Sequence, residues 1–208
     1  MKPLIFIGDG GHARVLIDLA RCLGREVFGV SSPTFKPGQS FDGVNVIGND
    51  HSVNKLNPAN IELVNAVGST SVGVIREKIY LSWKARGFCF ASLVHPSAVV
   101  AKEVRLGEGC QIMGGVVVQT GSIIGDNCIL NTCCSLDHDC NVAAHSHLAP
   151  GVIVCGGVSI GERSHIGAGS TLIQGVSLGG DVFVAAGATV VQSSPDRVKL
   201  RGTPARIY

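Results

Sequence analysis

The chain has few charged and few aromatic residues. Only 15 per cent of its 208 residues are Asp, Glu, Lys or Arg, and 5 per cent are aromatic. The formal net charge is +2, and the cations form no basic run. Proteins that bind nucleic acid or anionic membranes through charge need such a run or patch. We therefore expect neither kind of partner.

Long apolar segments are also absent from the sequence. The apolar run near the N-terminus, Leu4–Ile7, is interrupted at once by the glycine-rich stretch Gly8–Gly11. It is too short for the core of a secretory signal peptide, and no other run approaches the roughly 20 residues that span a bilayer. The sequence predicts a cytoplasmic protein without membrane insertion.

What the chain does contain is a repeat of six residues. Every sixth position is a branched aliphatic, without a miss or an insertion. These positions are Val94, Val100, Leu106, Ile112, Val118, Ile124, Leu130, Leu136, Val142, Leu148, Val154, Ile160, Ile166, Leu172, Leu178, Val184 and Val190. A period of six fits neither an amphipathic helix nor an alternating strand. It is typical of hexapeptide repeats, which form a parallel β-helix.

In such a β-helix each hexapeptide forms one short flat face and a turn. Three faces complete a coil, so residues eighteen apart stack in one column. The large aliphatic points into a prism-shaped interior, and a small residue four places later fills the space beside it. A single coil cannot bury its apolar side, so the stacked coils share one continuous core.

The eight cysteines do not indicate a disulfide framework or a metal site. No Cys-x-x-Cys pair is present, and such a pair is the usual mark of a zinc or redox site. Four cysteines instead occupy the small inward place of the repeat, where a thiol acts as a small apolar group. They are Cys110, Cys128, Cys134 and Cys140. We expect reduced, structural thiols and no metal.

Residues 1–92 predict an α/β nucleotide-binding domain, and residues 93–208 the β-helix. A buried strand over Pro3–Ile7 leads into a glycine turn and an amphipathic helix over Arg14–Leu23. This order is the first half of a nucleotide-binding βαβ unit, in which the helix N-terminus presents free N–H groups to phosphate. Alternatively, the glycines of this turn serve packing rather than contact with a ligand.

The rest of this domain is predicted as two further strands and one helix. Strands are expected over Glu26–Val30 and Glu62–Gly68, with a polar loop from Ser31 to Gly43. A helix is expected over Ile75–Arg86, with Ile75, Ile79 and either Trp83 or Leu81 facing inward.

One outward-facing stretch of the repeat carries candidate chemistry. His138 lies two places after the inward Leu136, which puts it at an outer corner, and Asp137 and Asp139 flank it. A carboxylate beside an imidazole orients the ring and raises the basicity of its free nitrogen. We interpret His138 as a base rather than a solvated surface histidine.

Motifs along nearly the whole chain carry a family resemblance. The sequence resembles the hexapeptide-repeat acyltransferases of the sialic-acid acetyltransferase and bacillosamine-pathway branch, many of which are nucleotide-sugar N-acetyltransferases. The matching segments are Gly8-Asp9-Gly10-Gly11-His12-Ala13, Asn131-Thr132, Asp137-His138-Asp139-Cys140, His145-Ser146-His147-Leu148-Ala149-Pro150-Gly151, Ile166-Gly167-Ala168-Gly169 and Gly202-Thr203-Pro204-Ala205.

The resemblance implies a left-handed β-helix and a homotrimer with acetyl-CoA bound between neighbouring copies. It implies that His138 takes a proton from a sugar amine, that Asp139 orients the imidazole, and that His147 contacts the thioester region or the substrate. Backbone along the solenoid would hold the pantetheine arm at Gly156, Ala168, Gly169 and Ala186. The nucleotide sugar would contact Gly10, Gly11, His12, Ser31, Ser32, Gly68, Ser69, Arg76 and Asn131.

The chain departs from the family pattern after the second strand. Ser31-Ser32 stands where the family often has an acidic pair that reads uracil, and Ser69 where it often has an amide or acid. This departure leaves the identity of the base open: UDP is the favoured carrier, and GDP or another carrier is the alternative. Both residues also have an interpretation without ligand contact. His12 would then be a structural cap, and Arg76 would be a solvated residue in the first turn of its helix.

We therefore predict N-acetylation of a nucleotide-linked 4-amino-4,6-dideoxy sugar for polysaccharide synthesis. The alternatives are O-acetylation of sialic acid, a non-catalytic sugar-nucleotide sensor, and a zinc hydrase like the γ-type carbonic anhydrases. The zinc alternative rests on His147 and His165, which are eighteen apart and should stack. Their arrangement with His138 does not match the ligand spacing of that family.

Overall fold

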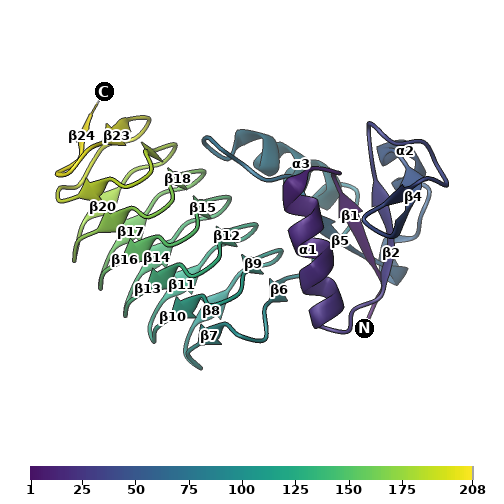
Figure 1. Ribbon diagram of the computed structural model, residues 1–208, viewed down its shortest axis with the longest axis horizontal. Coiled ribbons are helices and arrows are strands. Elements are labelled where there is room, and N and C mark those ends of the chain that lie inside the picture. Colours follow the sequence, from purple (N-terminus) through teal and green to yellow (C-terminus); the bar gives the residue numbers. More distant parts are fainter. Residues whose placement is uncertain (208) are drawn as a thin grey trace.

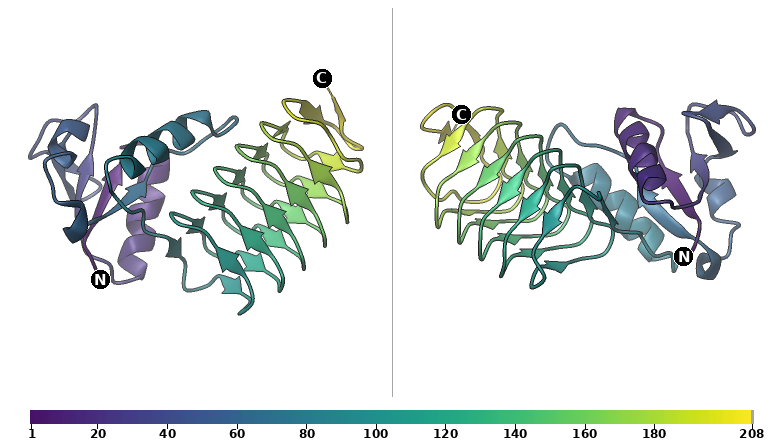
Figure 2. Two further views of the ribbon diagram at one scale, coloured as in Figure 1. Left: turned by 180° about the vertical axis from the view of Figure 1, so that it is seen from behind. Right: turned by 60° about the horizontal axis from the view of Figure 1, so that its bottom comes forward.

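The computed structural model describes residues 1–207, and it shows an α/β part packed against a stack of coils (Figure 1). We refer to residues 1–92 as the N-terminal domain and to the coils that follow as the prism. The prism extends away from the N-terminal domain, and its last coils lie at the far end of the molecule (Figure 2).

A five-stranded sheet forms the centre of the N-terminal domain, in the order β3-β4-β2-β1-β5. All pairings are parallel except that of β3 with β4. The strands are β1 (Leu4–Ile7), β2 (Val27–Ser31), β3 (Ser40–Phe41), β4 (Val44–Gly48) and β5 (Glu62–Asn65). The predicted polar loop from Ser31 to Gly43 therefore contains β3, and β4 was not predicted.

Three α-helices and one 3-10 turn accompany the sheet. They are α1 (Gly11–Cys22), α2 (Asp50–Val53), η1 (Pro58–Asn60) and α3 (Val74–Lys84). None of the helices within residues 1–207 has the length and apolar character to cross a membrane.

Helix α3 buries Trp83, one of the residues that the sequence predicts to face inward, but it does not bury Ile75. Ile75 is 67 per cent exposed, whereas Arg76, Tyr80 and Trp83 are buried. The prediction that Ile75 faces inward is wrong because α3 packs against a polar corner of the prism. The buried side of the helix therefore needs hydrogen-bonding groups more than aliphatic ones.

The prism is built from two-residue strands that pair in parallel with strands eighteen residues away, as Val118 does with Leu136. These strands form three parallel sheets, one for each face of the prism. We call them the β9, β10 and β11 faces, each after one strand that it contains. The strands are β6 (Leu93–Val94), β7 (Val99–Val100), β8 (Arg105–Leu106), β9 (Gln111–Ile112), β10 (Val117–Val118), β11 (Ile123–Ile124), β12 (Ile129–Leu130), β13 (Ser135–Leu136), β14 (Asn141–Val142), β15 (His147–Leu148), β16 (Ile153–Val154), β17 (Ser159–Ile160), β18 (His165–Ile166), β19 (Thr171–Leu172), β20 (Ser177–Leu178), β21 (Phe183–Val184) and β22 (Thr189–Val190).

The predicted repeat register is confirmed in every coil. From Ile112 to Val190 the aliphatic at each sixth position is buried. In the first coil Val94, Val100 and Leu106 are only partly buried, because no coil lies beneath them. The hairpin of β23 (Lys199–Arg201) and β24 (Arg206–Ile207) continues the β9 face at the opposite end.

The four inward cysteines lie inside the prism, as predicted. Cys110, Cys128, Cys134 and Cys140 are each at most 1 per cent exposed. Burial raises the pKa of Cys110 to about 11 and that of Cys134 to about 12, because a thiolate loses its hydration there. These thiols are therefore neutral packing groups.

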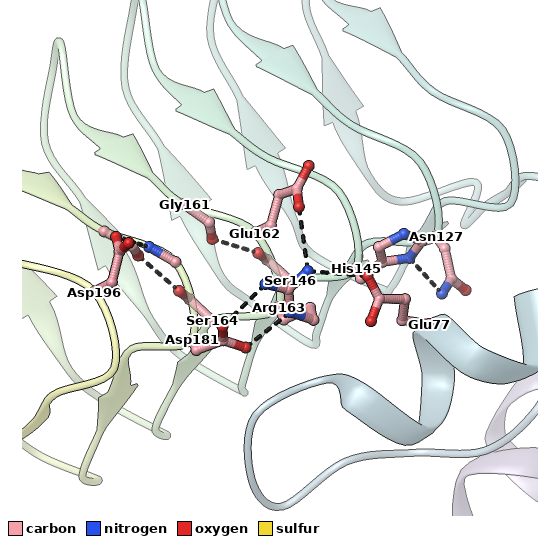
Figure 3. A network of polar contacts seen from close by, with 12 residues as sticks. Glu77, Asn127, His145, Ser146, Gly161, Glu162, Arg163, Ser164, Asp181 and Asp196 are labelled. Atoms are coloured by element: carbon pink, nitrogen blue, oxygen red, sulfur yellow. Dashed lines mark hydrogen bonds and ion pairs between the residues drawn. The ribbon is translucent and has the colours of Figure 1, made fainter. Parts of the chain in front are cut away.

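Helix α3 joins the two parts along one corner of the prism. The guanidinium of Arg163 donates to Glu77 of α3 at 2.9 Å and to both carboxylate oxygens of Asp181 at 2.8 and 2.9 Å (Figure 3). Two coils lower, the hydroxyl of Tyr80 donates to Asp126 at 3.2 Å. These contacts hold the N-terminal domain at a defined height on the prism.

Replacing Leu172 by Ala should reduce the free energy of unfolding by about 2 to 5 kcal/mol, because a fully buried side chain leaves a cavity in a close-packed core. Urea unfolding at a fixed protein concentration measures the change. Lys102→Ala, at an exposed corner, serves as the control and should change stability by less than about 0.5 kcal/mol. Equal effects of the two substitutions would contradict the assigned register.

Candidate active site

A cavity of about 1030 Å³ lies between the sheet of the N-terminal domain and the β9 face of the prism. Its walls come from the segments that follow four parallel strands and from two prism residues. The lining residues are Ile7, Gly8, Asp9, Gly10, Gly11, His12, Val15, Ser31, Pro33, Asn49, Asp50, His51, Ala66, Val67, Gly68, Ser69, Thr70, Ile79, Asn131 and His147.

The sheet order determines how these walls are arranged. The strands that end at the cavity follow the order β5, β1, β2, β4. The segment after β5 lies beside the prism residues, the glycine turn after β1 is in the middle, and the segments after β2 and β4 are farthest from the prism. With about 4.8 Å between strands, the four ends span roughly 14 Å. An elongated ligand fits this row.

Most of the predicted substrate residues line the cavity, and two do not. Gly10, Gly11, His12, Ser31, Gly68, Ser69 and Asn131 are in its wall, together with His147. Ser32 and Arg76 are buried at 2 and 1 per cent exposure and are not in the wall.

The predicted contact of Arg76 with a phosphate or ribose is not supported by its position. Its guanidinium donates to the carbonyl oxygens of Asn65 and Val67, and to the side-chain oxygen of Asn127 at 3.0 Å. Burial lowers its pKa to about 10. Arg76 therefore links β5, α3 and the prism from within the interface, so the solvated alternative is wrong as well.

The N-terminus of α1 opens into the cavity. Its N-cap residue is Gly10, and no side chain caps the first turn. A Cβ atom added at Gly10 or Gly11 would meet nothing within 4 Å, so the backbone there faces open space. Free N–H groups at the start of a twelve-residue helix attract anions such as phosphate.

His147 is held as a neutral imidazole where the cavity meets the prism. Its Nδ1 lies 2.9 Å from the hydroxyl oxygen and 3.1 Å from the carbonyl oxygen of Ser69. The carbonyl can only accept, so Nδ1 carries the proton. Its Nε2 accepts from the side-chain amide of Asn131 at 3.3 Å. Burial and the neighbouring His165 lower the pKa of His147 to about 3. His147 is therefore no base, and the second amide hydrogen of Asn131 remains for a ligand.

His12 is held in the same way from the other side. Gln111 of β9 donates its side-chain amide to Asn65 at 2.8 Å, so its oxygen accepts from Nε2 of His12 at 2.7 Å. Burial and the positive charge of Arg76 lower the pKa of His12 to about 4. The neutral ring keeps an unprotonated Nδ1, which can accept a hydrogen bond.

His138 has the opposite character. It stands on an outer edge of the prism with its side chain 52 per cent exposed, and its Nδ1 lies 2.9 Å from Asp139 Oδ2. The hydrogen bond to Asp139 and the charge of Asp137 raise the pKa of His138. Nδ1 carries the proton that Asp139 accepts, which leaves the lone pair of Nε2 free to accept a hydrogen bond or a proton.

The predicted cofactor residues lie on two different edges of the prism. A Cβ at Gly156 would come within 2.6 Å of the His138 ring, so this glycine makes room for the imidazole. Ala168, Gly169 and Ala186 lie on another edge, where their exposed backbone forms a narrow ladder. One copy of the chain does not bring these two groups together.

His138 and the cavity also lie apart in one copy. Asn131 and His147 belong to the β9 face and its border. His138 follows β13 and precedes β14, which places it on the edge between the other two faces. In a three-sided prism this edge is opposite the β9 face. A ligand in the cavity of one copy therefore cannot reach His138 of the same copy.

The expected histidine column is present on the β9 face. His147 pairs in register with His165, and their rings meet edge to face at 5.0 Å between centroids. His165 stacks on Phe183 at 5.5 Å. Within residues 1–207, no three His, Cys, Asp or Glu side chains are grouped so that they could hold a metal ion. The column therefore has no third ligand.

Gln111 and Asp50 were not predicted as site residues. Gln111 stands in the same column as His147, thirty-six residues earlier, so the eighteen-residue spacing could have identified it. Asp50 begins α2 in a segment without a periodic pattern, and the sequence carries no signal for it.

Comparisons with known proteins agree with this architecture. Residues 3–81 match the PglD N-terminal domain, residues 103–138 the bacterial transferase hexapeptide repeats, and residues 157–192 the hexapeptide repeat of succinyl-transferase. A stretch of 41 residues is 46 per cent identical to UDP-3-O-acylglucosamine N-acyltransferase of Leptothrix cholodnii, and it spans 20 per cent of this chain and 12 per cent of that relative.

Several solved structures are similar to this one over the whole chain. A point mutant of perosamine N-acetyltransferase from Caulobacter crescentus, in complex with CoA and GDP-perosamine, is 38 per cent identical with a TM-score of 0.93, covering 100 per cent of this chain and 97 per cent of that one. The acetyltransferase domain of PglB from Neisseria gonorrhoeae is 35 per cent identical with a TM-score of 0.92, covering both chains fully. These matches confirm the predicted left-handed β-helix.

The histidines should titrate differently in a pH series followed by NMR. His138 should show a midpoint above the ordinary histidine value, and Asp139→Asn should lower that midpoint by removing the hydrogen-bonded carboxylate. The resonances of His12 and His147 should stay those of neutral rings from pH 8 down to pH 5, since burial holds both pKa values at about 4 or below. Protonation of His147 within this range would contradict the assigned hydrogen bonds.

Proposed function

This chain belongs to the hexapeptide-repeat nucleotide-sugar acetyltransferases, and we propose that it transfers the acetyl group of acetyl-CoA to the amino group of a nucleotide-linked amino sugar. The observation that carries the proposal is the exposed His138–Asp139 pair at a glycine-lined edge, together with a separate cavity for an elongated anionic ligand. A 4-amino-4,6-dideoxy sugar is the proposed acceptor.

His138 acts as the base in this reaction. An ammonium group has no free electron pair, so the amine must lose a proton before or during attack. The neutral amine nitrogen attacks the thioester carbonyl, the carbon–sulfur bond breaks, and Nε2 of His138 receives the proton. The thiolate of CoA leaves and takes this proton from His138, which returns the imidazole to its neutral form. The hydrogen bond to Asp139 stabilises the imidazolium that forms.

The N-terminal cavity is the proposed site of the nucleotide sugar. The open N-terminus of α1 suits the diphosphate, because its N–H groups face the middle of the row. The sugar then lies toward the prism, within reach of Asn131 and His147. The nucleoside lies at the end formed by the segments after β2 and β4.

We further propose that the active site forms between copies of a homotrimer. His138 of one copy faces away from its own cavity, so the sugar amine must come from the cavity of a neighbour. The two cofactor edges come together in the same arrangement. The Gly156 edge of one copy and the Ala168–Gly169 edge of the next form the walls for the pantetheine arm of acetyl-CoA. We place this enzyme in the cytoplasm, where its eight free thiols stay reduced.

Replacing His138 by Asn should lower kcat by about 10² to 10⁴-fold and leave the affinity for acetyl-CoA nearly unchanged, because the base is lost while the cofactor walls remain. Steady-state release of CoA with nucleotide-linked amino sugars measures kcat. His95→Asn, in the first coil, is the matched control and should keep full activity. Turnover with free sialic acids alone would instead show an O-acetyltransferase. An unchanged kcat in His138→Asn would contradict the proposal that His138 is the base.

Two inactive variants should restore each other in mixed trimers. Gly10→Leu fills the cavity without striking the protein, and His138→Asn removes the base. If each site takes its cavity and its base from different copies, every mixed trimer has one intact site in three, and its activity is about a third of the wild-type value. Co-expression of the two tagged variants and assay of the purified mixed trimers measures it. Activity no higher than that of either variant alone would place the whole site in one copy.

A further inference from the structure

A second, smaller cavity lies between α1 and the edge of the prism where the β9 and β10 faces meet. Its volume is about 330 Å³. One wall is the side of α1 that carries Val15, Asp18 and Leu19, and the other is the prism edge around Met113 and Gly114. We call this cavity the side groove. Neither the nucleotide sugar nor the pantetheine arm occupies it in the proposed function.

The side groove meets the main cavity beside the proposed position of the sugar amine. Val15 lines both spaces, and it is 50 per cent exposed because both open onto it. On the prism, Asn131 lines the main cavity and the next residue, Thr132, lines the side groove. A ligand group held at Asn131 can therefore extend into the side groove.

The side groove also lies on the edge that carries the proposed cofactor walls. Backbone hydrogen bonds join successive coils along this edge, for example from Cys133 N to Gly114 O at 3.0 Å and from Gly151 N to Thr132 O at 2.9 Å. In steps of one coil the edge passes Gly114, Thr132, Pro150, Ala168 and Ala186. The side groove and the walls for the pantetheine arm are thus on opposite sides of Thr132.

The height of the proposed base places the thioester between these two regions. His138 follows Thr132 by six residues of an eighteen-residue coil, so it lies a third of a coil from Thr132 toward Pro150. In a trimer whose threefold axis runs parallel to the prisms, His138 of the neighbouring copy has the same height. The thioester carbonyl then lies near Thr132, and its sulfur points toward Ala168.

The carbon chain of the acyl group must point the other way. The sulfur and the acyl carbon leave opposite sides of the carbonyl carbon, so the acyl carbon points from Thr132 toward Gly114. The methyl group of an acetyl reaches only the mouth of the side groove. Gly114 has no side chain at this place, and a Cβ atom added there would lie 3.5 Å from Ser97 Oγ, its nearest neighbour. The structure therefore leaves room beyond the methyl group.

We propose that the side groove holds the carbon chain of a longer acyl group, so that the protein transfers propionyl and butyryl groups from their CoA thioesters as well as acetyl groups; this inference rests on the proposed function. The chemistry is unchanged, because the same carbon–nitrogen bond forms, the same carbon–sulfur bond breaks and CoA leaves as the thiol. Met113 and Leu19, each 2 per cent exposed, give the groove an apolar floor. Methionine adapts its shape to such a chain, and the exposed Asp18 keeps its carboxylate in water.

Calorimetric titration of the full-length protein with acetyl-CoA, propionyl-CoA and butyryl-CoA tests this proposal. Each methylene group buried in the side groove should raise the affinity by up to about fourfold, which corresponds to about 0.8 kcal/mol. With an acceptor that turns over with acetyl-CoA, butyryl-CoA should give the butyrylated sugar, detected by mass spectrometry. Butyryl-CoA that binds no more tightly than acetyl-CoA, or that gives no such product, would overturn the proposal.

Gly114→Leu fills the side groove and should weaken butyryl-CoA at least tenfold relative to acetyl-CoA in the same variant. Gly180→Leu is the matched control, because Gly180 occupies the same place of the repeat on another edge and a Cβ there would come no closer than 3.5 Å to its neighbours. It should keep the wild-type order of affinities. An unchanged order in Gly114→Leu would also overturn the proposal.

The same titrations separate this inference from the proposed function. Binding and transfer of acetyl without transfer of butyryl would remove only the role of the side groove. No binding of CoA or of any of its thioesters would overturn the acetyltransferase itself.

Discussion

The hydrogen-bonded stacking of coils eighteen residues apart is the constraint on which the whole molecule depends. Each two-residue strand is too short to be stable alone, so it exists only because the strands above and below accept and donate its backbone hydrogen bonds. The uninterrupted period of six keeps every large aliphatic inside. A single inserted residue would turn all later side chains out of register. Because the stack is rigid, side chains at its edges and on its faces keep a fixed position relative to the N-terminal domain.

Burial separates the histidines into two chemical kinds. His12 and His147 lie at the interface of the two parts, where loss of hydration keeps their rings neutral and their hydrogen bonds determine which nitrogen is protonated. They can orient a ligand and cannot take a proton from an amine. His138 stands in solvent with a carboxylate at 2.9 Å, which favours its charged form. The same residue type thus serves two roles, and the environment decides between them.

The N-terminal domain is attached to the prism through a buried polar network. Arg76, Asn65 and Asn127 exchange hydrogen bonds across the interface, and Gln111 extends the network to His12. A buried guanidinium is unfavourable unless its N–H groups are paired, so the network tolerates little displacement. The position of the cavity over the β9 face follows from it. That position also leaves the edge that carries His138 on the opposite side, which is why the proposed active site needs a second copy.

The repeat by itself determined the β-helix, the inward cysteines, the outward His138 and the stacked His147 and His165, because a strict period assigns every residue to the inside or the outside. The glycine turn indicated the α1 site in the same local way. Only the tertiary structure decided the rest. Arg76 and Ile75 exchange their expected roles because α3 meets a polar corner of another domain. Asp50 reaches Ser31 across nineteen residues of sequence, and Gln111 reaches His12 across ninety-nine. Such contacts depend on which surfaces the folded parts present to each other, and no short-range pattern in the sequence contains that information.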